Sequence, residues 1–169
     1  MKNNFLVFYL LFLVAQMLIC NYLHLTAYIT PSLLPALVLC LPTKIRTAVA
    51  LPVAFLTGLA VDMIAEGALG MNTVALLPVA LLRRSICNAL FGEELVVRGE
   101  DFSVRKYGLP KVLFAVFLVQ SLFLAVYLWA DGASARTLSF NLTRFAASLA
   151  AGMLLSIPVV NMLTPDDRR

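Results

Sequence analysis

Six apolar blocks, separated by short polar stretches, make up most of this chain. A membrane-spanning helix needs about 20 apolar residues to cross about 30 Å of hydrocarbon. Blocks of that kind predict spanning helices, because a membrane offers no water to satisfy open backbone groups. We expect spans at residues 5–25, 28–41, 47–65, 68–84, 109–130 and 142–163.

The second and fourth blocks are the weakest, since both are short or contain prolines. The second reads PSLLPALVLCLP, from Pro31 to Pro42, and spans a membrane only if it includes the preceding turn. Prolines are tolerated where a helix starts, and Pro42 marks its end. The fourth block is expected to extend beyond Arg83 and Arg84.

Composition agrees with this pattern. Of 169 residues, 62% are hydrophobic and 13% are charged, whereas about a quarter of a soluble domain is charged. The chain is therefore expected to be an all-α integral membrane protein, with a single transmembrane domain over residues 1–169 that is a bundle of six helices. The first block lacks a cleavage site and is expected to remain as a helix rather than a signal peptide.

The basic residues indicate the orientation. With six spans and a cytoplasmic start, eleven of the thirteen fall on the cytoplasmic side, and only Arg136 and Arg144 fall outside. Positive residues favour the cytoplasmic side, so both termini are expected there. The net charge of +4 is thus explained by topology, and nucleic acid is not expected as a partner.

A polar connector, residues 85–108, separates the fourth and fifth spans on the cytoplasmic side. It is either a solvated link held at the lipid headgroups, with a short interfacial helix over 85–97, or a docking surface for a partner.

Catalytic and metal-binding signatures do not occur in the sequence. Cys20, Cys40 and Cys87 have no metal-ligand spacing and are expected to be small apolar fillers. The sequence holds no phosphate loop, nucleophile elbow or paired carboxylates. We therefore expect no enzymatic activity, no metal and no cofactor.

The stretch GLAVDMIAEGALGMN, residues 58–72, places acids at the end of the third block. A negative charge near a helix C-terminus opposes the helix dipole. Asp62 and Glu66 would also put like charges on one face of a continuing helix, since they lie four residues apart.

The simplest resolution is a tight helical hairpin. The helix would stop after Asp62 and turn at Gly67 and Gly70, and the free N–H groups of the next helix would bind the carboxylate. Asn72 at that helix start would bind the same group. Two alternatives remain: a catalytic or proton-carrying Asp62, and a role in binding a partner or ligand.

Other polar residues lie inside apolar blocks. Arg144, near the outer end of the sixth span, either extends to the headgroups or pairs with Asp62. Gln16 and Gln120 are expected to form hydrogen bonds between helices.

The residues Gly58, Asp62, Leu69, Gly70 and Asn72 resemble the pattern of the MreD family, the bacterial rod shape-determining membrane proteins. About 60 residues carry the specific match, and the length and six-helix layout agree along the whole chain. Asn72 is a departure, because relatives often have histidine there.

The resemblance implies a non-enzymatic scaffold of the lateral cell-wall elongation machinery in the inner membrane, without a cofactor. It would bind MreC and act through it on a RodA-type glycosyltransferase, the elongation transpeptidase and MreB. The family is similar in fold to the substrate-binding subunits of energy-coupling-factor vitamin transporters, which supplies the alternative. A single alanine in the first span, Ala15, is against that alternative, because such subunits often dock through an Ala-x-x-x-Ala patch there.

Overall fold

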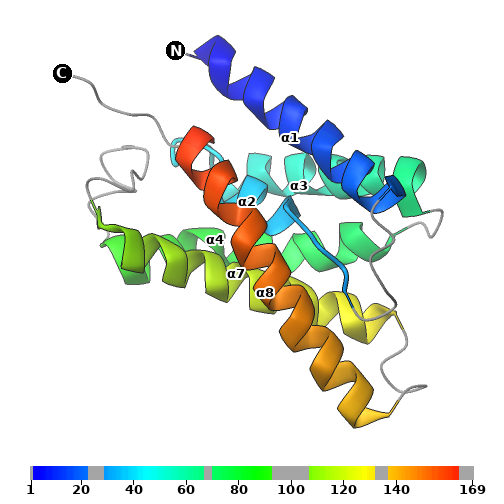
Figure 1. The fold of residues 1–169 in the computed structure, drawn as a ribbon. Coiled ribbons are helices and arrows are strands. Elements are labelled where there is room, and N and C mark those ends of the chain that lie inside the picture. The colour runs from blue at the N-terminus through cyan, green and yellow to red at the C-terminus, as the bar shows by residue number, and fades with distance from the viewer. Residues whose placement is uncertain (1, 23–28, 67–69, 93–106, 132–136, 164–169) are drawn as a thin grey trace.

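The computed structural model describes residues 2–22, 29–66, 70–92, 107–131 and 137–163, which form a helical bundle (Figure 1). Its helices, in chain order, are α1 (Lys2–Tyr22), α2 (Leu34–Leu39), α3 (Thr47–Val61), the π-helix η1 (Asp62–Glu66), α4 (Met71–Phe91), α7 (Leu109–Ala130) and α8 (Leu138–Leu163).

Four of these helices have the length and hydropathy to cross a membrane. They cover Thr47–Ile64, Met71–Phe91, Leu109–Ala130 and Ser139–Leu163. The long helices also carry large apolar side chains that point away from the core, such as Leu56, Leu142 and Leu154, each more than 60% exposed. A water-soluble protein rarely leaves so many apolar residues uncovered. The part of the chain that the structure describes is a helical bundle with the properties of a membrane protein.

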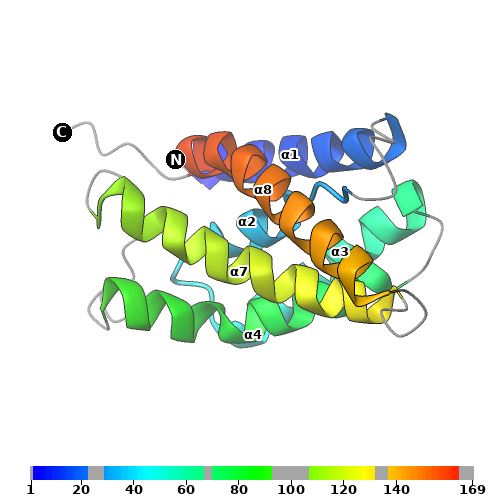
Figure 2. The same cartoon turned by 60° about the horizontal axis from the view of Figure 1, so that its bottom comes forward.

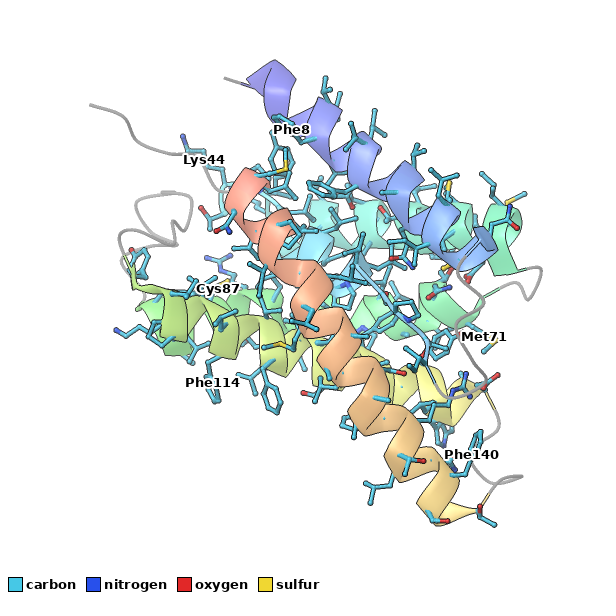
Figure 3. The ribbon with its side chains drawn as sticks, viewed as in Figure 1. Phe8, Lys44, Met71, Cys87, Phe114 and Phe140 are labelled. Atoms are coloured by element: carbon cyan, nitrogen blue, oxygen red, sulfur yellow. The ribbon has the colours of Figure 1, made fainter. Side chains whose placement is uncertain are left out.

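The bundle has two ends (Figure 2). Helices α1, α3 and α7 begin at one end, where α4 and α8 finish; we call it the Lys44 end. At the other, the Met71 end, α4 and α8 begin and α1, α3 and α7 finish (Figures 2 and 3). From α3 onward each long helix runs antiparallel to the one before it, whereas α1 and α3, which are separated by α2, run in the same direction.

The predicted second span, residues 28–41, is helical only over Leu34–Leu39. Prolines explain the difference: Pro31 and Pro35 lack backbone N–H groups, and a proline disfavours helical geometry in the residue before it. All six residues of α2 are buried, at 0% exposure for its leucines, its alanine and its valine. The short helix is thus the centre of the core, around which the long helices pack (Figure 1).

Of the other predicted boundaries, some agree with the structure and some differ. The fifth span, 109–130, matches α7, and the third, 47–65, matches α3 with η1. The sixth begins earlier than predicted, at Leu138. The fourth reaches Phe91, so the first seven residues of the predicted connector are its last two turns. Residues 93–106 of the connector lie outside the described residues, as do residues 23–25 of the first span.

Candidate functional site

Asp62 is completely buried, and its carboxylate accepts five hydrogen bonds from the start of α4. Oδ1 accepts from the backbone N of Asn72 and from its Nδ2, both at 3.0 Å. Oδ2 accepts from the N of Gly70 at 3.0 Å, the N of Thr73 at 3.1 Å and the Oγ1 of Thr73 at 2.6 Å. We call Asp62, Gly70, Asn72 and Thr73 the clasp.

The clasp forms because the first turn of a helix lacks hydrogen-bond acceptors for its amides, and a buried carboxylate supplies them. The first amides of a helix have no acceptor within it, and its dipole favours negative charge there. Gly70 adopts a left-handed φ of 103°, which glycine tolerates, and this turns the amides back towards Asp62. The predicted binding of Asp62 by these amides and by Asn72 is confirmed.

One detail of that prediction is wrong: the helix does not stop after Asp62. It continues through Glu66 as a π-helix, a wider turn that often marks a functional or strained position. The wider turn is one way to carry a helix past an acid whose side chain is turned towards another helix. Gly67, the other glycine of the predicted turn, lies outside the described residues.

Gly58 lets α3 and α4 approach closely beside the clasp. A Cβ at this position would lie 2.6 Å from the Cα of Thr73 and 2.8 Å from its backbone N, closer than non-bonded atoms approach. The contacted atoms are backbone and have no flexible end that moves aside. Gly58 and Asp62, four residues apart, therefore both contact the same residue, Thr73.

Arg144 does not pair with Asp62. It donates from Nη1 to Oδ2 of Asp131, the residue that ends α7, and its own side chain is 8% exposed. The ion pair links the end of α7 to the first turns of α8 at the Met71 end. Sequence reasoning missed Asp131, although an acid directly after an apolar block and an arginine early in the next block were the available signal.

A second set of polar contacts holds the non-helical residues before α2. We call residues 29–41, which include α2, the central segment. Gln16 of α1 accepts from the N of Leu33 at 2.7 Å and donates to the O of Pro31 at 3.2 Å. Gln120 of α7 donates to the O of Ser32 at 3.2 Å. Gln16 and Gln120 form hydrogen bonds between elements, as predicted, but their partners in these bonds are backbone groups of this segment and not groups of another long helix.

Two further long helices bind the same segment. The Oγ of Ser148 in α8 accepts from the backbone N of Thr30 at 3.0 Å. Arg83 of α4, 5% exposed, donates from Nε to the O of Leu39 at 3.2 Å and from Nη2 to the O of Leu41. Non-helical backbone survives at membrane depth only where protein satisfies its polar groups, and these side chains do so.

Small residues make room for these contacts. Gly152 of α8 lies against the side chain of Gln120, and a Cβ there would overlap its amide.

Helix α1 has a further polar link, since the hydroxyls of Tyr9 and Thr57 lie 2.8 Å apart and Thr57 donates to the O of Val53. Polar side chains therefore bind α1, α7 and α8 to the interior of the bundle.

The contacts around Asp62 hold the backbone at the start of α4 in place. The five donors to Asp62 are neutral amide and hydroxyl groups, none of which is a general acid or base at neutral pH. Within the described residues, no group of three or more His, Cys, Asp or Glu side chains is placed to hold a metal ion. Three cavities between described side chains have volumes of about 10 Å³ each, room for roughly one water molecule.

No protein-family model, curated protein or solved structure matches this chain.

Proposed function

We propose that this chain is a non-enzymatic scaffold subunit of the bacterial cell-wall elongation machinery, of the MreD type, and that it binds MreC. The observation that carries the proposal is the clasp. Four of the five residues behind the resemblance, Gly58, Asp62, Gly70 and Asn72, meet at one contact between α3 and α4. The residues behind the resemblance therefore share one structural role, which supports the proposal.

The proposed topology has six crossings in the inner membrane, with both termini cytoplasmic. The start of α1 and the end of α8 lie at the Lys44 end (Figure 2). Described basic residues gather at that end, namely Lys44, Arg46, Arg83, Arg84 and Lys111, against Arg144 at the other. Positive residues favour the cytoplasm. The central segment supplies the second crossing, protected from lipid by the surrounding helices.

In this proposal the chain is a rigid platform for partner helices. Two polar networks fix its interior, and the outward faces of α1, α3 and α8 are apolar, with Leu10, Leu56 and Leu154 at least 50% exposed. MreC binds one such face, and the RodA-type glycosyltransferase, the elongation transpeptidase and MreB are reached through MreC. A scaffold shifts their activity only if its contacts differ between the inactive and active assemblies.

The alternative, a vitamin-binding transport subunit, has less support, because it requires a large ligand pocket inside the bundle. Pockets for such ligands measure about 300–1,000 Å³. The three cavities described above are far smaller, and the central segment, which includes α2, occupies the middle of the bundle.

Site-specific photo-cross-linking tests the proposal. A photoreactive residue at position 10, 56 or 154 is expected to capture MreC from one helix face when the two proteins are co-expressed in the membrane. Leu81 of α4, 52% exposed, is the matched control on another helix. Depletion of the chain should also make rod-shaped cells round. Correctly inserted protein that captures no MreC from any of these faces, in cells that stay rod-shaped, would rule out the proposal.

A further inference from the structure

A small cavity lies inside the bundle towards the Met71 end, between the start of α4 and the non-helical residues before α2. Figure 3 labels Met71, the residue before Asn72, at this end. The cavity has a volume of about 10 Å³, room for roughly one water molecule. Four parts of the chain, α1, the central segment, α4 and α7, contribute its lining, which consists of Gln16, Thr30, Pro31, Ser32, Asn72, Phe123 and Tyr127.

The cavity touches both polar networks of the interior. Asn72 belongs to the clasp, where its Nδ2 donates to Oδ1 of Asp62. Thr30 and Ser32 belong to the central segment, which side chains of α1, α7 and α8 hold. Among the described residues, no direct hydrogen bond joins the clasp to the central segment. The two networks therefore meet around this space without a bond of their own.

Hydrogen-bonding capacity remains on three of the side chains that line the cavity. Asn72 is only 3% exposed, yet its Oδ1 and the second N–H of its Nδ2 have no partner in the part of the chain that the structure describes. Ser32, 5% exposed, accepts from the backbone N of Leu34, and its O–H is still available to donate. The hydroxyl of Thr30 lies 3.1 Å from the Oγ of Ser148 and keeps a second lone pair.

The size and the lining of the cavity together favour water as its ligand. Five of the seven lining residues have polar side chains, and a buried donor or acceptor without a partner is destabilising. Inside a membrane, bulk water does not supply that partner. A cation would need acceptors alone, whereas Ser32 and Asn72 also present donors. The cavity between α7 and α8 is different, because leucine, isoleucine and valine make up most of its lining and apolar cavities stay dry.

We propose that the cavity at Asn72 binds one water molecule, which joins the clasp to the central segment. The water donates to Oδ1 of Asn72, accepts from the hydroxyl of Ser32 and has Thr30 as a third partner. Buried waters typically make about three such bonds. The start of α4 is thereby tied to α1, α7 and α8 through the central segment. This water site is additional to the scaffold function and does not depend on MreC.

Radiolytic labelling of the full chain in lipid nanodiscs, measured by mass spectrometry, tests the proposal. X-rays split water into hydroxyl radicals, which oxidise aromatic side chains next to the water that produced them. Phe123 and Tyr127, 1% and 6% exposed, line the cavity. Phe12 and Tyr9, 8% and 6% exposed, lie outside all three cavities and are the matched controls. We expect each aromatic residue at the cavity to be labelled faster than its control of the same type.

A substitution at Ser32 tests whether the labelling comes from this cavity. Ser32→Val replaces the hydroxyl with a methyl group and adds a second methyl, so the cavity loses both a partner and the room for water. Labelling of Phe123 is expected to fall to the rate of Phe12. Ser156→Val is the matched control, because Ser156 is a buried serine, 1% exposed, that does not line this cavity. It should leave the labelling of Phe123 unchanged.

Several results would overturn the proposal. Wild-type Phe123 labelled no faster than Phe12 would mean a dry cavity, and this comparison holds even if Ser32→Val fails to fold. Unchanged labelling of Phe123 in a folded Ser32→Val variant would mean that radicals arrive from bulk water. An equal fall in Ser32→Val and Ser156→Val would remove the link to this cavity. A higher melting temperature in sodium than in potassium at equal ionic strength, lost in Ser32→Val, would assign the cavity to a cation.

Discussion

Replacing Asp62 with alanine is expected to lower the free energy of unfolding by about 3–4 kcal/mol, because several buried donors lose their acceptor together. Three of these donors are backbone amides at the start of α4 and have no acceptor within the helix. Reversible unfolding in mixed detergent micelles measures the change. Asp62→Asn should lie between wild type and Asp62→Ala, since an amide NH₂ would face donors on one side.

Thr73→Val is the graded control for Asp62→Ala. It removes one hydroxyl donor, at 2.6 Å from Oδ2, and preserves the shape of the side chain and the backbone bond of Thr73. A loss of about 1 kcal/mol is expected from a single hydrogen bond. If Asp62→Ala were no more harmful than Thr73→Val, the carboxylate would not be the group that holds the hairpin.

Gly58→Ala is expected to destabilise the protein by about 2–3 kcal/mol, the upper part of the range for forcing extra carbon atoms into a packed core. The methyl would lie 2.6 Å from the Cα of Thr73, so α3 and α4 must separate before it fits. The result is unusual for this substitution, because alanine is normally preferred over glycine inside a helix by about 1 kcal/mol. The same unfolding assay measures it.

Gly152→Ala is the matched control, a glycine-to-alanine change inside another long helix. Its methyl would meet the end of the Gln120 side chain, which turns aside more easily than backbone. About 1 kcal/mol is expected, from the lost bond between Gln120 and the carbonyl of Ser32. A Gly58→Ala variant as stable as wild type would contradict the close approach of α3 and α4.

The clasp was predictable because its physics is local. Asp62 and its partners lie within eleven residues of one another, and an unpaired acid at a helix end next to glycines needs donors. Helix starts are the nearest supply. The π-turn was not predictable, since nothing in a short apolar sequence distinguishes a helix that ends at Asp62 from one that widens there.

The central segment was misjudged for the opposite reason. Its apolar character is that of a spanning helix, but its conformation depends on distant side chains such as Gln16, Gln120 and Arg83. A polar residue in an apolar block indicates that its side chain forms a hydrogen bond, but the sequence does not identify the partner. The same limit explains Arg144, for which two acids near one membrane face, Asp62 and Asp131, were compatible with the pattern.

The central structural claim is that Gly58 and Asp62 act on one contact, the first turn of α4 at Thr73. A double-mutant cycle of Gly58→Ala and Asp62→Ala, measured by unfolding in mixed micelles, tests it most directly. Residues that share a contact couple by about 0.5–3 kcal/mol. The claim predicts that the double variant loses less unfolding free energy than the sum of the two single losses, by about 1 kcal/mol or more. Additivity within about 0.3 kcal/mol would contradict it.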